Sequence, residues 1–214
     1  MIIAVDGPTA SGKGTISKRL AEHFRLPCLD TGLLYRAVGW TVKQFDGDPE
    51  NATDALKACR FPDDLLNDPV LRSESIGSYA SKVSVHPPVR AALDKRQKDF
   101  ANQSGGAVLD GRDIGTVIAP DADAKLFITA SAEARAVRRY KEMIARAEDV
   151  NFDDILADIL KRDERDQNRA TAPLKPAEDA DLLDTSDLTI DAAVQQAIAL
   201  VNAKLSRRRD KDPA

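Results

Sequence analysis

The feature that most restricts how this chain can fold is a glycine-rich segment that separates two apolar patterns of different period. Residues 1–5, MIIAV, form a short continuous apolar run, which is typical of a strand buried on both faces of a parallel sheet. From Thr15 onward, apolar residues recur at helical spacing between Ile16 and Phe24, and charged residues fall on the other face. The segment GPTASGKGT, residues 7–15, therefore connects a strand to the start of a helix.

This segment has the composition of a phosphate-binding loop. Its glycines allow a tight turn, its N–H groups can converge on phosphate oxygen atoms at a positive helix end, and Lys13 adds a mobile charge. A tight turn alone would leave the lysine without a role. Because Gly14 follows the lysine, the hydroxyl groups of Thr15 and Ser11 are the candidates to lie near Mg²⁺. We predict that ATP binds the whole loop: Gly7, Pro8, Thr9, Ala10, Ser11, Gly12, Lys13, Gly14 and Thr15.

The rest of the chain alternates short apolar runs with helical patterns. Further strands are predicted at 107–109, 125–129 and 182–185, and helices at 33–45, 87–103, 131–147, 151–168 and 191–205. This alternation predicts an α/β fold in which helices cover both faces of a central parallel sheet.

Residues 46–86 interrupt this alternation. Three prolines punctuate short acidic and polar stretches there, before a helical pattern resumes near Val70. We therefore predict a single domain, with a core of residues 1–45 and 87–214 and an insert of about 46–86.

Three arginines are spaced at helical intervals, because Arg165 and Arg169 lie three and seven residues after Arg162. Such offsets place side chains on one stripe of a helix. Phosphoryl transfer requires cationic groups of this kind around the migrating group. The alternative is a solvated helix whose arginines pair with the neighbouring aspartates. We predict a lid at about 150–175 that brings arginines to a nucleotide and excludes water.

A second charged cluster directly follows the predicted strand 107–109. Ligands of open α/β folds bind at the carboxyl ends of the strands, which is where Asp110, Arg112 and Asp113 would lie. Asp110 could hold a Mg²⁺-bound water, while Arg112 and Asp113 could contact a second substrate. A turn stabilised by aspartate is the simpler alternative.

Composition and missing motifs narrow the possible functions. The 31 Lys+Arg and 35 Asp+Glu give a net charge of −4, which argues against general binding to nucleic-acid phosphates. No uncharged apolar run approaches the roughly 18 to 20 residues of a membrane span, and the first residues lack the pattern of a secretion signal. No Asn-Lys-x-Asp motif for guanine occurs, which argues against a GTPase. We expect a cytoplasmic protein with neither nucleic-acid nor membrane partners.

Five motifs, in order along nearly the whole chain, resemble those of the cytidylate kinase family in the nucleoside monophosphate kinase group. They are GPTASGKGT at 7–15, LDTGLLYR at 29–36, SKVSVHPPVRAAL at 81–93, DGRDIGTVIAPDA at 110–122 and RDERDQNRATAPL at 162–174. The resemblance implies the three-layer P-loop kinase fold, with a central parallel sheet, a lid and an inserted monophosphate-binding element. It also implies transfer of the γ-phosphoryl group of ATP, with Mg²⁺, to CMP or dCMP in pyrimidine nucleotide metabolism. We expect the enzyme to be a monomer.

The resemblance also implies roles for individual residues. Lys13, Arg162 and Arg165 would be catalytic, and Thr15 and Asp110 would hold the metal directly or through water. The CMP site would comprise the following residues: Thr31, Arg36, Ser81, Arg90, Arg112, Asp113, Asp166 and Arg169.

The chemistry of cytosine agrees with this assignment. Its exocyclic amine is a donor, so the Asp113 carboxylate could accept from it and Ser81 or Arg112 could donate to its acceptors. Uracil presents a carbonyl in place of the amine and would be penalised. Arg36 and Arg90 suit the acceptor's phosphate, while Asp166 and Arg169 suit its ribose.

The sequence departs from the family in two places, and alternatives remain open. Thr31 stands where many members have serine, which retains the hydroxyl group. Residues 46–80 lack the alternating pattern of the family's small three-stranded domain and lead toward a helix instead. The alternatives are a kinase for UMP, AMP or a small metabolite such as shikimate, and a P-loop switch that binds nucleotide without transferring phosphate.

Overall fold

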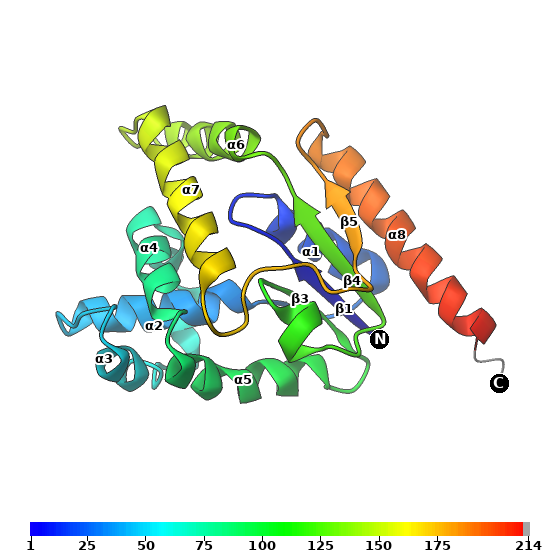
Figure 1. The fold of residues 1–214 in the computed structure, drawn as a ribbon, viewed down its shortest axis with the longest axis horizontal. Coiled ribbons are helices and arrows are strands. Elements are labelled where there is room, and N and C mark those ends of the chain that lie inside the picture. Colours follow the sequence, from blue (N-terminus) through cyan, green and yellow to red (C-terminus); the bar gives the residue numbers. More distant parts are fainter. Residues whose placement is uncertain (212–214) are drawn as a thin grey trace.

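A single five-stranded parallel sheet forms the centre of the molecule (Figure 1). The computed structural model describes residues 1–211. The strand order is β2-β3-β1-β4-β5, and every neighbouring pair is parallel. The strands are β1 (Ile2–Asp6), β2 (Cys28–Asp30), β3 (Ala107–Gly111), β4 (Ala124–Thr129) and β5 (Asp181–Asp184). The predicted α/β class with a central parallel sheet is confirmed.

Strand β2 is the one strand that sequence patterning did not predict. It has three residues, none of them fully buried, so neither a continuous apolar run nor a clear alternation can develop. Its place at the sheet edge is fixed by pairing with β3, where Asp30 lies opposite Asp110. This register brings two carboxylates together at the carboxyl end of the sheet.

Helices cover both faces of the sheet, as the alternating pattern predicts. On one face, α1 (Lys13–Phe24) and α8 (Ile190–Lys211) pack against apolar side chains of the central strands, with Ile3, Val5 and Ile128 fully buried. On the other face, α5 (Pro87–Ala101) and the π-helical turn η3 (Ile114–Ile118) enclose Ala4 and Leu109. Among the described residues, no helix is long and apolar enough to cross a membrane.

The segment after α2 (Thr31–Gln44) is helical along much of its length, whereas the sequence predicts a helical pattern only from near Val70. It contains α3 (Ala52–Lys57), the short 3₁₀ helices η1 (Asp63–Asn67) and η2 (Pro69–Arg72), and α4 (Glu74–Val83). No β-strand occurs between residues 46 and 86, all of which the structure describes. Helix α4 packs along α2 through an apolar cluster that includes Ala80 and Val83. The insert is thus attached to the core by helix packing.

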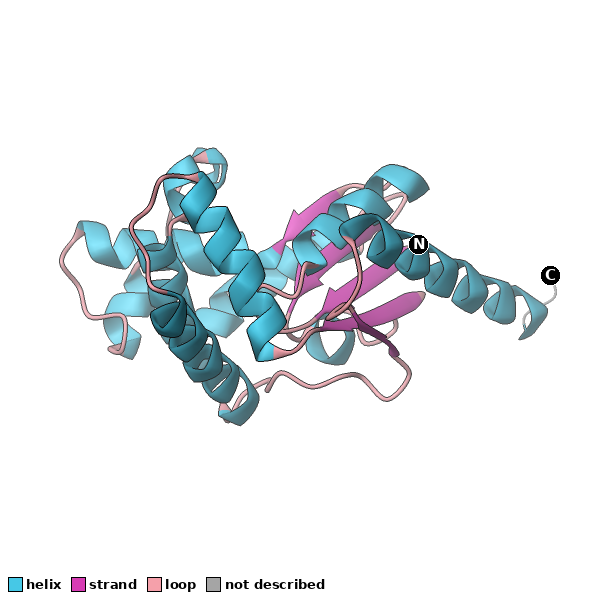
Figure 2. Cartoon of the chain, turned by 90° about the horizontal axis from the view of Figure 1, so that it is seen from above, coloured by secondary structure: helices cyan, strands magenta, loops and turns pink. Residues whose placement is uncertain are grey.

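Helices α6 (Ala132–Ala145) and α7 (Phe152–Asn168) pack against each other through a small apolar cluster of their own. Asn151 caps α7 by accepting hydrogen bonds from the backbone N–H groups of Asp153 and Asp154. Figures 1 and 2 place these helices and the insert beyond one end of the sheet, opposite the end of α8. The strand arrows of β4 and β5 point toward this side, so the carboxyl ends of the strands face it.

Candidate active site

Two neighbouring cavities, which share part of their lining, open at the carboxyl ends of the strands. The larger has a volume of about 740 Å³ and the smaller about 90 Å³. The residues that line both cavities mark the junction between them: Thr9, Gly32, Arg36, Arg112 and Arg162. Three cationic side chains therefore lie where a group passing from one cavity to the other would travel.

The loop at 7–15 turns tightly beneath the larger cavity. At Gly7, a Cβ atom would lie 2.0 Å from the carbonyl oxygen of Ile128, so any side chain there would collide with β4. Gly12 has a φ of 87°, in the left-handed region that glycine adopts without strain, and α1 begins at the next residue. No side chain caps α1 and its first turn contains no acidic residue, so its positive end is available to an anion.

Lys13 is buried at this helix end and its ammonium group is held by two oxygen atoms. Nζ donates to the carbonyl of Pro8 at 3.2 Å and lies 3.9 Å from Oδ1 of Asp110. Burial lowers the pKa of Lys13 and raises the pKa of Asp110, because both charged forms lose contact with water. A phosphate at this position would supply the negative charge that favours protonated Lys13.

The loop residues differ in their access to the larger cavity. Those that line it are Thr9, Ala10, Gly12, Lys13, Gly14 and Thr15. Ser11 is fully buried and lines neither cavity, whereas the exposed Thr15 does reach the larger one. Of the two hydroxyl candidates for the metal, the structure therefore favours Thr15.

The oxygen donors near Thr15 fit a magnesium ion that is held mainly by a nucleotide. Asp30 and Asp110 lie opposite each other in the sheet register, and both line the larger cavity with Thr15. Within residues 1–211, no group of three or more His, Cys, Asp or Glu side chains has the geometry of a metal site. Mg²⁺ commonly binds one or two carboxylates and completes its coordination with phosphates and water, which matches this donor set.

The smaller cavity brings together all eight residues predicted for the acceptor site: Thr31, Arg36, Ser81, Arg90, Arg112, Asp113, Asp166 and Arg169. They come from α2, α4, α5, the segment after β3, and the end of α7. Tyr35 also lines this cavity, and the guanidinium of Arg90 lies 5.5 Å from its ring centre. Sequence reasoning missed Tyr35, although it falls within the LDTGLLYR motif.

Ion pairs organise the polar side chains of the smaller cavity. The Asp113 carboxylate accepts a hydrogen bond from Arg90 and lies 3.6 Å from Nη2 of Arg169. Nε of Arg112 donates to Oδ2 of Asp166 at 2.9 Å. Because Arg90, Asp113, Asp166 and Arg169 are buried, these pairs fix the directions in which the remaining donors and acceptors point.

A buried carboxylate of β1 stabilises the turn that follows Asp113. Asp6 accepts hydrogen bonds from the backbone N–H groups of Ile114 and Gly115, each at 2.8 Å, and so holds the π-helical turn that follows Asp113. Burial raises the pKa of Asp6 to about 6 despite these two hydrogen bonds. The sequence did not predict this turn, because its stabilising partner is more than a hundred residues away.

The arginine stripe of α7 faces inward. Arg162 and Arg169 are buried and Arg165 is half-buried; Arg169 follows the last helical residue and has an extended backbone. Nη1 of Arg165 donates to Oγ of Ser81 at 2.7 Å, and Arg165 is absent from the lining of both cavities. Of the two arginines predicted to be catalytic, Arg162 is therefore the one that reaches the junction of the cavities.

The alternative, in which the arginines pair with neighbouring aspartates, holds for one contact of α7: Nε of Arg162 pairs with Oδ2 of Asp158, one turn earlier, at 2.7 Å. Arg162 is nevertheless buried, and the aspartates next to the stripe pair with other elements. Asp163 pairs with Arg135 of α6, with Nη1 to Oδ1 at 2.9 Å, and Asp166 pairs with Arg112. Asp163 and Asp166 thus join α7 to α6 and to the segment after β3, while Arg162 and Arg169 line the cavities.

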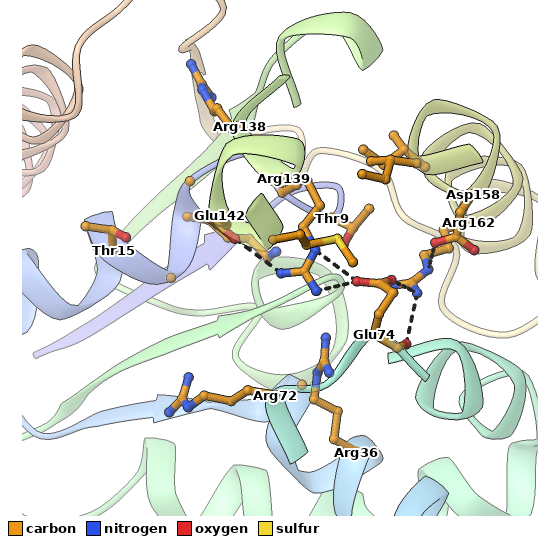
Figure 3. A pocket seen from close by; sticks show the side chains of 18 of the residues that line it. Thr9, Thr15, Arg36, Arg72, Glu74, Arg138, Arg139, Glu142, Asp158 and Arg162 are labelled. Carbon is orange, nitrogen blue, oxygen red and sulfur yellow. Dashed lines mark hydrogen bonds and ion pairs between the residues drawn. The ribbon is translucent and has the colours of Figure 1, made fainter. Parts of the chain in front are cut away.

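Sequence reasoning also missed two charged residues at the wall of the larger cavity. They are Glu74, at the start of α4, and Arg139 of α6. Glu74 forms ion pairs with Arg139 and with Arg162 of α7 (Figure 3). Nearby, Nη1 of Arg36 donates to the carbonyls of Leu71 at 2.7 Å and Ser73 at 3.0 Å. The sequence has no local signal for these contacts, because they join segments far apart in the chain.

Comparisons with known proteins agree with one another. The model of the family "Cytidylate kinase" matches residues 3–203. A cytidylate kinase of Caulobacter sp. (strain K31) is 53% identical over 207 residues, covering 96% of each chain. One of Xanthobacter autotrophicus (strain ATCC BAA-1158 / Py2) is 55% identical over 209 residues, covering 97% of this chain and 100% of that protein.

A solved structure shares the fold at lower sequence identity. The crystal structure of an uncharacterized protein from Eubacterium ventriosum aligns with a TM-score of 0.59 and 18% identity, covering 95% of this chain and 98% of that one. At this identity the likeness concerns the fold alone.

Proposed function

Since this chain belongs to the cytidylate kinase family, we propose that it transfers the γ-phosphoryl group of ATP to CMP or dCMP, giving ADP and CDP or dCDP. An oxygen of the acceptor's phosphate attacks the γ-phosphorus, and the bond to the oxygen that bridges the β- and γ-phosphates breaks. Such a transfer depends mainly on positioning and on stabilisation of charge, with little need for a general base.

The observation that carries this proposal is the junction of the two cavities. Arg36, Arg112 and Arg162 line both, with Lys13 on the side of the larger cavity and the pair of Arg90 and Asp113 on the side of the smaller. A kinase with two nucleotide substrates requires such an arrangement, in which a donor site and an acceptor site meet at a cationic centre.

On the donor side, the phosphates of ATP would bind the loop 7–15 at the start of α1. Lys13 and Arg162 would stabilise the charge that develops on the migrating group. Thr15 and Asp110 would hold Mg²⁺, directly or through water. Bound there, the metal neutralises phosphate charge and orients the nucleotide.

On the acceptor side, the polar residues of the smaller cavity divide the recognition of CMP. Asp113 would accept from the exocyclic amine of cytosine, because a carboxylate oxygen retains a lone pair after binding one arginine. Ser81 and Arg112 would donate to the other base atoms. Asp166 and Arg169 would orient the ribose, and Arg36 and Arg90, with the hydroxyl of Thr31, would serve the phosphate end.

The roles of the peripheral segments belong to the same proposal. Residues of about 150–175 would act as a lid that excludes water, and those of about 46–86 as the monophosphate-binding insert. Arg165, the third predicted catalytic residue, would have to leave Ser81 to touch a phosphate. We further propose that the enzyme works as a cytoplasmic monomer.

An acceptor panel tests the proposed function. The purified protein is incubated with ATP, Mg²⁺ and one of CMP, dCMP, UMP or AMP, and the diphosphate product is detected directly. We expect CMP and dCMP to be phosphorylated with the highest kcat/KM. A preference for UMP or AMP would contradict the base assignment, and slow release of phosphate with no diphosphate product would indicate a switch protein instead.

A further inference from the structure

The carboxylate of Glu74 lies within a group of arginines that face the nucleotide cavities. Its Oε1 accepts from Nη2 of Arg162, and its Oε2 accepts from Nε of Arg139 at 2.9 Å and also from Nη2 of that residue. Figure 3 shows Glu74 between the two guanidinium groups, at the wall of the larger cavity. A single carboxylate therefore joins α4 to both α6 and α7.

A third guanidinium lies close to this pair. A Cβ atom on Gly77 would lie 2.9 Å from Nη2 of Arg36 and 3.0 Å from Nη1 of Arg162, so the two arginines converge above this glycine. Arg36 is held by backbone carbonyls and brings no carboxylate with it. Burial raises the pKa of Glu74, but Arg162, Arg139 and Arg36 outweigh it and hold the pKa below its usual range.

Three guanidinium groups around one carboxylate form the kind of site that binds a phosphate group. Carboxylate and phosphate oxygens both accept from the planar edges of arginine, and Glu74 uses the Nε and Nη2 edge of Arg139 that a phosphate would use. Arg162 and Arg36 also line the junction of the two cavities. Glu74 thus competes for the donors that the transferred group needs.

We propose that the Glu74 carboxylate occupies the position of a substrate phosphate group and is exchanged for that group when nucleotides bind. This inference rests on the proposed function for the identity of the nucleotides. The Glu74 carboxylate keeps the arginines in place before substrate binds, because without it the ion pairs with Asp158 and Glu142 would be left to offset the charge of three neighbouring guanidinium groups. Glu74 also weakens the binding of phosphate groups, because breaking its ion pairs reduces the net binding free energy.

The same exchange links substrate binding to the contact between insert and lid. Besides the Glu74 ion pairs, α4 and α7 are joined by the hydrogen bond from Arg165 to Ser81. When phosphates replace the Glu74 carboxylate, Arg139 and Arg162 are held by the nucleotides. Helix α4 then keeps the Ser81 contact and a long hydrogen bond from Nη2 of Arg162 to the backbone carbonyl of Glu74, at 3.5 Å. Glu74 therefore acts as a positioning residue, through Arg139 and Arg162.

Binding of inorganic tripolyphosphate, measured by titration calorimetry, tests the exchange. Glu74→Gln keeps the size of the side chain but removes its charge, and we expect this variant to bind tripolyphosphate at least about fivefold more tightly than wild type. Glu74→Asp keeps the charge, but its side chain is too short to bridge both arginines. We expect its affinity for tripolyphosphate to be about twofold higher than that of wild type. In Glu74→Gln, KM for ATP should fall along with the dissociation constant.

Two charge-matched variants serve as controls. Glu142→Gln removes a carboxylate that contacts Arg139 at 3.2 Å from its exposed side, and we expect it to change the affinity by less than about twofold. Glu50→Gln removes a carboxylate that pairs with Lys82 at 2.9 Å and lines neither cavity, and it should leave the affinity unchanged.

The outcomes separate this inference from the proposed function. Unchanged or weaker tripolyphosphate binding in both Glu74 variants would overturn the exchange and reduce Glu74 to a structural ion pair, even if wild type phosphorylates CMP. If Glu74→Gln binds tripolyphosphate more tightly but the wild-type protein does not phosphorylate CMP, the exchange is supported and the assigned substrate is overturned. If Glu74→Gln does not fold, the Glu74→Asp result decides alone.

Discussion

The two cavities of this protein are built in different ways. The phosphate end of the larger one is formed by a continuous segment, residues 7–15, between a strand and a helix that are adjacent in the chain. The smaller one is formed by residues that range from Thr31 to Arg169 and come from several separate elements. The donor side is therefore determined mostly by local sequence, and the acceptor side by the packing of the whole domain.

Their charges differ in the same way. Lys13 faces the larger cavity and forms an ion pair with Asp110, at 3.9 Å. In the smaller cavity the charged groups are paired with one another, as in the contacts of Asp113 with Arg90 and Arg169. A substitution in the loop should thus act directly on phosphate charge, whereas one in the smaller cavity should also disturb its neighbours.

The largest expected effect tests the donor side. Lys13→Ala should lower kcat about 100- to 1000-fold, because the ammonium group stabilises charge on the transferred phosphoryl group more than it stabilises bound ATP. The variant leaves the buried Asp110 without its charged partner, so it should be less stable than wild type but still folded. Steady-state kinetics and circular dichroism check both points. Lys18→Ala, at the same cavity but on an exposed residue, is the control; an equal loss there would count against a specific role for Lys13.

A second prediction concerns Asp6, which lies directly before the phosphate loop yet supports the turn after Asp113. Its folded pKa of about 6 exceeds the ordinary value of 3.8, so between these values the folded protein holds a proton that the unfolded chain has lost. Stability should therefore decrease as pH rises through this window, by about 3 kcal/mol in total relative to Asp6→Asn. Denaturant unfolding from about pH 2.5 to 7 covers this window and the more acidic one in which Asp179 titrates.

Asp179→Asn provides the contrast for this measurement. A hydrogen bond from Lys125 lowers the pKa of Asp179, so its contribution is present above pH 3.8 and is lost as the pH falls further. The stability difference between wild type and Asp6→Asn should thus decrease as the pH rises from 3.8 to about 6, whereas the difference between wild type and Asp179→Asn should decrease as the pH falls below 3.8. A flat difference between wild type and Asp6→Asn would mean that Asp6 does not take up a proton in the folded protein.

The third prediction compares two arginines of α7. Arg162 lies at the junction of the cavities, whereas Arg165 contacts Ser81. Arg162→Ala should lower kcat about 10- to 100-fold, in line with the loss of a charged hydrogen bond, with a smaller change in ATP affinity. Arg165→Ala should have a clearly smaller effect on kcat. If both variants lose only thermal stability while the folded fraction turns over normally, α7 contributes ion pairs and no catalysis.

The smallest effect tests base recognition on the acceptor side. Asp113→Asn should lower the ratio of kcat/KM for CMP over UMP by at least about tenfold, because the amide both accepts and donates where the carboxylate only accepts. The substitution also leaves the buried Arg90 without its charged partner, so the variant should be less stable. The ratio of two substrates does not depend on the folded fraction. A ratio within about twofold of wild type would direct attention to Ser81 and Arg112.

Much of the donor side was predictable from sequence, and the reason is local. The apolar run before the loop and the helical pattern after it identify β1 and α1. Glycines and a lysine between such a strand and helix are typical of a phosphate-binding loop. The eight acceptor residues were predicted only through resemblance to a family, since nothing in the spacing of Thr31, Ser81, Arg90 and Asp113 requires them to meet. The structure brings these eight together in one cavity.

The α/β class, the phosphate loop and the helix at the end of the insert could be predicted from the sequence, because these follow from local periodicity and composition. The tertiary structure alone decided the short edge strand β2, the π-helical turn held by Asp6, and the placement of Glu74 among arginines. Each of these depends on a partner distant in the chain: a neighbouring strand, a buried carboxylate, or a guanidinium from another helix. Burial then makes such contacts specific, since an ion or N–H group removed from water must find a partner.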